Sequence, residues 1–412
     1  MANNDADGMG AGVEWPRGFR GYAGHAGVRQ SGNDLSIIAS ERPAVSAAVF
    51  TRSRFAGPSV VLSRRHAADQ RMSAIVTVAS NANVATGAEG ERNAAELAAL
   101  VGDLLEIPAE RVLVSSTGVI GRQLPMAPLR AHLGGGGAGG AHRDGPAATV
   151  AGAEDFDADP LAVAGAMMTT DTHAKVSSRT VGEARVVGVA KGVGMIEPDM
   201  ATMLAYLVTD AEVGPIELDN ALRSAVDRTF NCLSVDTDTS TSDTVALLAN
   251  GAAGPVDADA FAEAVHAVCL DLTEQLARDG EGATKLLRVV VQGAASPAQA
   301  KRIAKSVLNS PLVKTAVHGA DPNWGRVVMA VGKNTEHEED LAITPERTTV
   351  RFGAMEVYPT ATGEEELARL VEIMRQDEVE IGVTLGLGEG AATVYGCDLS
   401  DGYVRINADY TT

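Results

Sequence analysis

The stretch Lys191-Gly-Val-Gly-Met-Ile-Glu-Pro-Asp-Met-Ala-Thr-Met-Leu204 places two glycines, a proline and a threonine directly before an apolar run. Glycines at positions 192 and 194 allow a tight turn or a close approach of the backbone to a ligand. The run at 202–209 is typical of a buried strand, and it opens with Thr202. Composition alone favours an ordinary β-branched strand residue over a functional hydroxyl at Thr202.

Short apolar strands and amphipathic helices alternate along the rest of the chain. Strands often follow one another in adjacent pairs, which predicts an α+β protein with stacked mixed sheets flanked by helices rather than a doubly wound parallel sheet. The pattern predicts strands at 35–39, 44–50, 74–79, 112–115, 184–190, 202–209, 286–292, 326–331, 348–352, 378–385 and 392–395, and helices at 89–105, 125–133, 160–168, 216–230 and 257–278.

Residues 134–153 interrupt this alternation. They contain Gly-Gly-Gly-Gly-Ala-Gly-Gly and little that could be buried, so the composition predicts a flexible surface insert. A phosphate-binding loop is the weaker interpretation, because no strand runs directly into the glycines and no Lys-Ser/Thr pair follows them.

The bulk composition excludes several classes of protein. The 412 residues carry a net charge of −20, which disfavours nucleic acids and anionic membranes as partners. Cys232, Cys269 and Cys397 are far apart and lack CxxC spacing, so we expect three buried thiols rather than a zinc site or a disulfide framework. No basic, apolar leader and no run of about 18 apolar residues is present, so we expect a cytoplasmic protein.

The opening stretch resembles the processing site of the ornithine acetyltransferases, also called glutamate N-acetyltransferases, with the pattern Lys-Gly-x-Gly-Met-[Ile/Leu]-x-Pro-x-x-Ala-Thr-Met-Leu. Further segments resemble the same family in the same order, from about Pro16 to the end of the chain. They are 79–87 (ASNANVATG), 116–121 (STGVIG), 168–172 (MTTDT), 235–244 (VDTDTSTSDT), 279–285 (DGEGATK), 309–319 (NSPLVKTAVHG), 321–326 (DPNWGR) and 403–412 (YVRINADYTT).

The resemblance implies an α-β-β-α sandwich of the type shared with DmpA-like proteins, with a smaller C-terminal α/β lobe. It also implies self-cleavage between Ala201 and Thr202, giving an α chain (1–201) and a β chain (202–412) that form one catalytic unit and assemble as an α₂β₂ heterotetramer. A hydroxyl needs a nearby base to act as a nucleophile at neutral pH. In this family the freed α-amine of the N-terminal threonine is that base, so Thr202 is the expected nucleophile.

The implied reaction is a ping-pong transfer of acetyl from N²-acetyl-L-ornithine to L-glutamate, without a metal or an organic cofactor. Thr117 and Gly118 are the expected oxyanion donors, because they follow a strand at a turn that exposes N–H groups. Lys191 is expected to pair with the substrate α-carboxylate and Glu281 with a side-chain ammonium. The family's substrate-binding positions fall on Thr169 or Thr170, Lys191, Thr202, Glu281, Asn407 and Thr412.

Two conspicuous segments are interpreted as structural. His318, Asp321, Asn323 and Trp324 are expected in a turn between a helix and a strand that supports the site. The alternating acids of 236–243 lack the glycine and terminal glutamate of a calcium loop, and their period of two suits a strand edge and a turn.

Two other functions remain open at this stage. One is an N-terminal-nucleophile amidohydrolase or aminopeptidase with the same fold, in which water replaces glutamate. The other is a non-catalytic amino-acid-binding protein, which would leave the chain uncleaved and free of acetyl groups.

Overall fold

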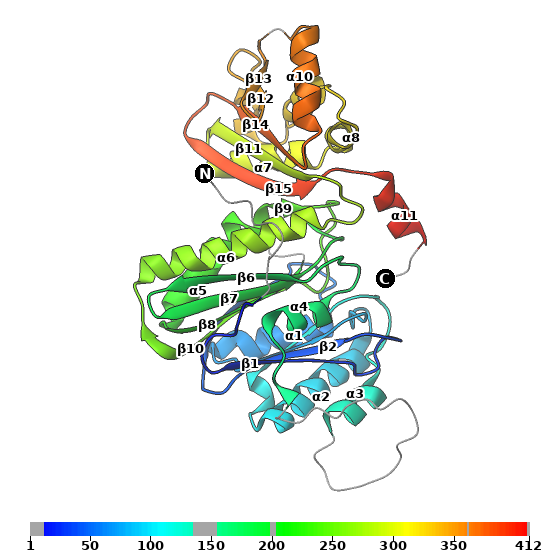
Figure 1. The fold of residues 1–412 in the computed structure, drawn as a ribbon, viewed down its shortest axis with the longest axis vertical. Helices are drawn as coiled ribbons and strands as arrows, with labels where there is room; N and C mark the ends of the chain where they lie inside the picture. Colours follow the sequence, from blue (N-terminus) through cyan, green and yellow to red (C-terminus); the bar gives the residue numbers. More distant parts are fainter. Residues whose placement is uncertain (1–11, 135–154, 198–202, 361, 410–412) are drawn as a thin grey trace.

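Two stacked sheets lie between helices, and a third sheet forms a lobe at one end of the molecule (Figure 1). The computed structural model describes residues 12–134, 155–197, 203–360 and 362–409. The expected α+β architecture of mixed sheets flanked by helices is therefore confirmed.

The first sheet has the strand order β1-β2-β4-β5. Helices α1, α2 and α3 cover its outer face, where Leu62, Leu97 and Leu129 join one apolar cluster with the strands. The bounds are β1 Phe19–Gly24, β2 Leu35–Ser40, β4 Ala74–Val78, β5 Val112–Ser116, α1 Pro58–His66, α2 Gly87–Leu105 and α3 Met126–Leu133.

The second sheet has the order β3-β10-β8-β7-β6, with β8 and β10 parallel and the other pairs antiparallel. Helices α5 and α6 cover its outer face, and α4 packs along β1, β2, β6 and β7. The bounds are β3 Val45–Phe50, β6 Lys175–Val181, β7 Ala184–Lys191, β8 Leu204–Glu212, β10 Thr244–Pro255, α4 Pro160–Met167, α5 Pro215–Arg228 and α6 Ala258–Arg278.

A layer of buried apolar side chains joins the inner faces of these two sheets. Because side chains alternate along a strand, each sheet gives every second residue to this layer. Ile38, Ile75 and Leu113 of the first sheet share it with Tyr206 and Leu248 of the second. The buried Tyr206 hydroxyl accepts a hydrogen bond from Thr77 at 3.1 Å, so its polar tip is satisfied inside the layer.

The C-terminal lobe is built on the sheet β13-β12-β14-β11-β15-β9. It confirms the expected smaller α/β lobe, and β9 ties it back to the segment that follows α5. The bounds are β9 Leu233–Ser234, β11 Leu286–Ala294, β12 Thr349–Phe352, β13 Met355–Tyr358, β14 Glu378–Thr384, β15 Gly390–Cys397, α7 Pro297–Leu308, α8 Pro311–Gly319, α9 Gly325–Gly332, α10 Glu364–Met374 and α11 Asp401–Asp409.

Several helices begin at a capping residue followed by proline. The side chains of Asp159, Ser296 and Ser310 each accept a hydrogen bond from a backbone N–H of the first turn of α4, α7 or α8. The proline that follows has no N–H to leave unsatisfied at the first helical position. The N-termini of these helices can therefore be predicted from the local sequence, an Asp or Ser followed by proline.

The strand predicted at 326–331 is wrong, because this segment is helix α9. Its buried residues Val327, Ala330 and Val331 follow helical spacing, whereas Met329 is 41% exposed. The turn at 320–324 therefore joins two helices. The strand edge expected at 236–243 is also absent, because the described backbone there consists of bends and irregular structure that lead into β10.

Some predictions fall outside the described residues. They include the scissile pair Ala201-Thr202, the terminal Thr412 and the glycine-rich insert beyond Gly134. The chain resumes at Met203, which is buried, and β8 begins one residue later.

Candidate active site

A buried carboxylate organises the segment that follows α4. Asp171 accepts hydrogen bonds from the Gly192 N–H at 2.7 Å and from Lys175 Nζ at 2.9 Å through one oxygen. Its other oxygen accepts from the Thr169 N–H at 3.1 Å and lies 3.6 Å from Lys191 Nζ. Asp171 thus fixes the 169–171 turn against the end of β7.

Opposite charges determine the ionisation of this carboxyl group. Burial alone raises the pKa of Asp171, but the charges of Lys191 and Lys175 and the hydrogen bond from Gly192 outweigh it. The pKa of Asp171 therefore lies well below its usual range, and the carboxylate stays charged.

A second buried acid extends the ion-pair network. Lys175 is fully buried, and its Nζ lies 2.6 Å from Asp279 Oδ2 as well as against Asp171. Asp279 also accepts from the Thr172 N–H at 3.0 Å. Two lysines and two aspartates thus connect the 169–172 segment, β6, β7 and the loop after α6, with their charges balanced.

The two threonines at 169 and 170 contact different charged groups. Lys191 Nζ donates to Thr169 Oγ1 at 2.8 Å, and Lys191 is 7% exposed. Thr170 Oγ1 donates to Glu281 Oε1 at 3.0 Å. Both threonines, which the sequence left as alternatives, therefore belong to the cluster, one beside a cation and the other beside an anion.

Glu281 is bound on three sides. Asn407 Nδ2, on α11, donates to Glu281 Oε2 at 2.8 Å, and the Glu281 N–H donates to Val193 O at 2.8 Å. A Cβ on Gly194 would lie 2.4 Å from the same Oε2, so the glycine leaves room for the carboxylate. Gly194 of the opening stretch thus leaves the space that the Glu281 carboxylate occupies.

Thr117 and Gly118 lie at the end of β5, where the chain turns past Ser80. Gly118 has φ +126°, and an added Cβ would lie 2.3 Å from the Ser80 carbonyl carbon, so only glycine fits. The Thr117 N–H already donates to Val78 O at 3.0 Å. The Gly118 N–H has no partner within the described part of the chain.

A cavity of about 780 Å³ brings these segments together. Gly118 lines it from one side and Thr169 and Thr170 from another, while Lys191 and Glu281 contact the threonines from behind. Of the predicted site residues that the structure describes, Thr169, Thr170, Lys191, Glu281 and Asn407 form one connected cluster. Gly118 faces the same cavity, and Thr117 precedes it.

Thr202, the expected nucleophile, lies outside the described residues, but its described neighbours are close to the cluster. Lys191 pairs with Leu204 across β7 and β8, and the Thr244 N–H donates to Met203 O at 3.0 Å. Asp243, which precedes Thr244, is 2% exposed, and its Oδ2 has no hydrogen-bond partner within the residues that the structure describes. Burial raises the pKa of Asp243 well above its usual range.

Sequence reasoning missed Asp171, Lys175, Asp279 and Asp243. The two acids of the network lie inside motifs quoted for the family resemblance, and Lys175 lies on a strand that the pattern did not reveal. Lys175 and Asp279 are 104 residues apart in the sequence, and no local sequence pattern can predict a contact over that separation.

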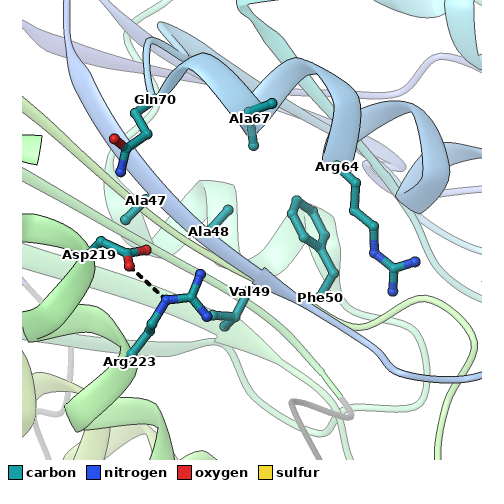
Figure 2. A pocket seen from close by; sticks show the side chains of 10 residues that line it. Ala47, Ala48, Val49, Phe50, Arg64, Ala67, Gln70, Asp219 and Arg223 are labelled. Atoms are coloured by element: carbon teal, nitrogen blue, oxygen red, sulfur yellow. Dashed lines mark hydrogen bonds and ion pairs between the residues drawn. The ribbon is translucent and has the colours of Figure 1, made fainter. Parts of the chain in front are cut away.

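Other features of the molecule lie away from this site. Figure 2 shows a pocket of about 440 Å³ where Phe50 of β3 and Arg64 of α1 lie near Asp219 and Arg223 of α5, and no described residue of the predicted site lines it. The three cysteines are free and buried, as expected. Among the described residues, no group of three His, Cys, Asp or Glu side chains could hold a metal ion, and no helix could span a membrane.

His318 supports the site from the lobe. Its Nδ1 lies 2.7 Å from Asp398 Oδ2, and Asp398 accepts from the Thr284 N–H at 2.8 Å in the loop that carries Glu281. Trp324 instead donates to Thr362 within the lobe at 3.1 Å, and Asp321 pairs with Arg326 at 3.2 Å.

The α+β sandwich places Lys191 against Thr169 and Glu281 against Thr170, and these two threonines line one cavity, an arrangement typical of an enzyme site. Comparison with known proteins gives the family: the ArgJ family model matches residues 20–412, and the chain belongs to the ArgJ family. A glutamate N-acetyltransferase of Streptomyces clavuligerus is 52% identical over 403 residues, covering 96% of this chain and 98% of that protein. An arginine biosynthesis bifunctional protein ArgJ of Rhodococcoides fascians is 48% identical over 402 residues, covering 96% and 94%.

A solved structure is also similar. The crystal structure of the arginine biosynthesis bifunctional protein ArgJ from Bacillus halodurans shares 40% sequence identity, with a TM-score of 0.47, and the match covers 51% of this chain and all of that one.

Proposed function

We propose that the chain is a glutamate N-acetyltransferase, an acyltransferase that moves acetyl from N²-acetyl-L-ornithine to L-glutamate on Thr202. The relatives at 48% and 52% identity over nearly the whole chain support this reaction class. The observation that carries the proposal is the cluster around Thr169 and Thr170. It places the buried cation of Lys191 against Thr169 and the carboxylate of Glu281 against Thr170, and both threonines line one cavity. An amino acid with a cationic side chain requires such a pair of opposite charges.

The first step is self-cleavage. The Thr202 Oγ attacks the Ala201 carbonyl carbon, the Thr202 nitrogen leaves and takes up a proton, and an ester joins the two parts. Water then hydrolyses the ester and frees the Thr202 α-amine. The pieces are an α chain (1–201) and a β chain (202–412), which together form one catalytic unit and assemble as an α₂β₂ heterotetramer.

The freed amine is suited to act as the base. An α-amine has a reference pKa of about 7.7–8.0, so it accepts a proton from the Thr202 hydroxyl near neutral pH. The hydroxyl oxygen attacks the acetyl carbonyl of N²-acetylornithine, giving acetyl-Thr202 and releasing ornithine with the proton on its α-nitrogen. Glutamate then attacks acetyl-Thr202 through its α-amine and forms N-acetylglutamate. The Thr202 oxygen leaves and takes back a proton, and the proton lost by the glutamate nitrogen passes to the Thr202 α-amine and on to that oxygen.

The remaining residues bind the substrates or stabilise the tetrahedral intermediates. The Gly118 N–H and the Thr117 hydroxyl receive the oxyanion of each tetrahedral intermediate. Lys191, held by Asp171 and Thr169, receives the α-carboxylate of both substrates. Glu281, held by Thr170 and Asn407, receives the side-chain ammonium of ornithine, and Thr412 completes the substrate contacts. No metal ion or organic cofactor enters these steps.

The test is a product balance. The purified protein is incubated with N²-acetylornithine, with and without glutamate, and ornithine, N-acetylglutamate and acetate are quantified. We expect equal amounts of ornithine and N-acetylglutamate when glutamate is present. Acetate in place of N-acetylglutamate would identify an amidohydrolase, and the absence of all three products would identify a binding protein.

A further inference from the structure

The cavity that contains Gly118 has a cationic wall. Two arginines, Arg29 and Arg122, line it, and no acidic residue does. This contrasts with the whole chain, in which 54 acidic residues outnumber 34 basic ones. A local positive wall in a strongly acidic protein favours an anionic group of a bound ligand.

Arg29 lies on the loop between β1 and β2, which a buried acid holds in place. Asp34 is fully buried and accepts hydrogen bonds from the N–H groups of Ala26, Val28 and Arg29 at 2.6, 2.7 and 2.9 Å. The Arg29 guanidinium donates to Met168 O at 3.3 Å, immediately before Thr169. The loop is thus fixed, and Arg29 is anchored beside the substrate-binding threonines.

Arg122 lines the same cavity from the turn that carries Gly118. Hydrogen bonds hold the backbone on both sides of it, from the Gly121 N–H to Val84 O and from Asn81 Nδ2 to Gln123 O, each at 2.9 Å. Its side chain is exposed and has no hydrogen-bond or ion-pair partner among the described residues. The backbone is therefore positioned while the guanidinium is available.

The charges of the guanidinium groups are not neutralised within the protein. Arg29 donates its side-chain hydrogen bonds to the backbone carbonyls of Gly32, Asn33 and Met168, which carry no net charge. In the described part of the chain neither arginine side chain pairs with a carboxylate. A guanidinium with free N–H groups binds a carboxylate through two parallel hydrogen bonds.

We propose that Arg29 and Arg122 form a subsite for the side-chain carboxylate of the acceptor. This inference rests on the proposed function and answers a question that it raises. Glu281 attracts the ammonium of the donor but repels a second carboxylate, so glutamate needs another place for its side chain. The donor side chain lies toward Glu281, and the acceptor side chain lies toward the arginines, on the cavity side of Thr169 and Thr170.

The experiment compares L-glutamate with its neutral isostere L-glutamine. Both carry the same α-groups, so their difference reports only the side-chain carboxylate. Dissociation constants are measured by calorimetry, and the rates at which the two amino acids discharge pre-formed acetyl-enzyme are measured by rapid quench. The proteins are the wild type, Arg122→Gln, Arg29→Gln and the charge-matched control Arg375→Gln, which lies beyond α10 in the C-terminal lobe.

We expect the wild type to prefer glutamate over glutamine. Arg122→Gln should reduce that preference about tenfold, both in the dissociation constants and in the discharge rates. A tenfold change lies between the effect of losing an exposed ion pair and that of losing a sequestered one. Arg29→Gln should lose preference in the same direction. Arg375→Gln should keep it, although it removes the same charge. Acetylation of Arg122→Gln by N²-acetylornithine should stay within twofold of the wild type.

Three outcomes would overturn the subsite: a wild type without preference for glutamate, an unchanged preference in both arginine variants, or an equal loss in Arg375→Gln. Failure of the proposed function gives a different result. The wild type would then bind glutamate in preference to glutamine, and lose that preference in Arg122→Gln, without forming acetyl-Thr202 or N-acetylglutamate.

Discussion

Glu281 is the residue on which donor recognition depends in this account. Its carboxylate is held by Thr170 and Asn407, so it is already oriented before a substrate arrives. We expect Glu281→Gln to slow the formation of acetyl-Thr202 from N²-acetylornithine more than its discharge by glutamate, because only the donor carries a side-chain ammonium. Burst kinetics with the two half-reactions timed separately provide the measurement.

The size of the Glu281 effect reports how far the site excludes water. Breaking a sequestered ion pair costs about 3–5 kcal/mol, whereas an exposed pair contributes less than about 1 kcal/mol. Equal losses in both half-reactions would mean that Glu281 serves the α-amine or the fold instead of the ornithine side chain.

The proposed oxyanion role of Thr117 rests on its hydroxyl, since its N–H already donates to Val78 O. Loss of one oxyanion donor typically lowers kcat by about 10²–10³-fold, so we expect Thr117→Ala to reduce acetyl transfer by roughly 10²-fold and to slow self-cleavage as well. Steady-state rates and a cleavage time course provide the test, with thermal melting as the control for folding. Transfer within twofold of the wild type would remove Thr117 from this role.

At the scale of elements, Asp171 joins α4, β6 and β7. Removing one partner of a buried ion-pair network leaves another charge unpaired, so Asp171→Asn should reduce the free energy of unfolding by about 3–5 kcal/mol at pH 7. Urea unfolding of both proteins at several pH values measures this difference.

The pH dependence of the Asp171 effect follows from the direction of its pKa shift. Because the folded pKa is lowered, the stabilising contribution is complete above the unfolded value of 3.8 and is lost as the pH falls through the lower folded value. The gap between wild type and Asp171→Asn should be constant from pH 7 to 5 and should narrow only below about pH 4. A gap that narrowed near neutral pH would point to another group.

For Asp243, which directly precedes β10, we expect the opposite dependence of stability on pH. Burial raises its pKa well above the usual range, so the folded state keeps a proton that the unfolded state loses above about pH 4. Stability therefore falls as the pH rises between the two values. We expect Asp243→Asn to raise Tm relative to the wild type more at pH 8 than at pH 4, and equal shifts at both pH values would contradict a protonated Asp243.

The elements also show what the sequence could and could not predict. Continuous apolar runs identified β2, β4 and β8, and apolar residues at helical spacing identified α6. The family motifs pointed to the residues that cluster around Glu281. The pattern did not reveal α9, because a short apolar run fits a strand and a helix equally well until its neighbours decide which face is buried. It also missed α7 and α8, although each starts with Ser-Pro, a readable capping signal.

The buried network had no such local signal. Asp171, Lys175 and Asp279 come from three segments, and each is an ordinary charged residue in its own stretch of sequence. Only the packing of β6 and β7 against α6 removes them from water and makes their charges depend on one another. This is why sequence motifs pointed to the proposed substrate-binding residues but not to the buried charges that hold them in place.

At the scale of the whole molecule, segments from three parts of the fold meet at the candidate site. The turn after β5 comes from the first sheet, Lys191 from the second, and Glu281 from the loop that leads into the lobe. In the proposed cleavage, the first 201 residues supply Gly118, Thr169, Thr170 and Lys191, and the remainder supplies Thr202, Glu281 and Asn407. Neither chain alone would hold a complete site.

The central claim is that Thr202 becomes the N-terminal, acetyl-carrying residue of its own chain. Mass spectrometry of the purified protein, before and after brief exposure to N²-acetylornithine without glutamate, tests it most directly. The account predicts two fragments, the second beginning at Thr202 and gaining one acetyl group on that residue, while Thr202→Ala stays intact and unmodified. A wild-type protein that keeps only its full-length mass after prolonged incubation, or that carries the acetyl group on another residue, would contradict it.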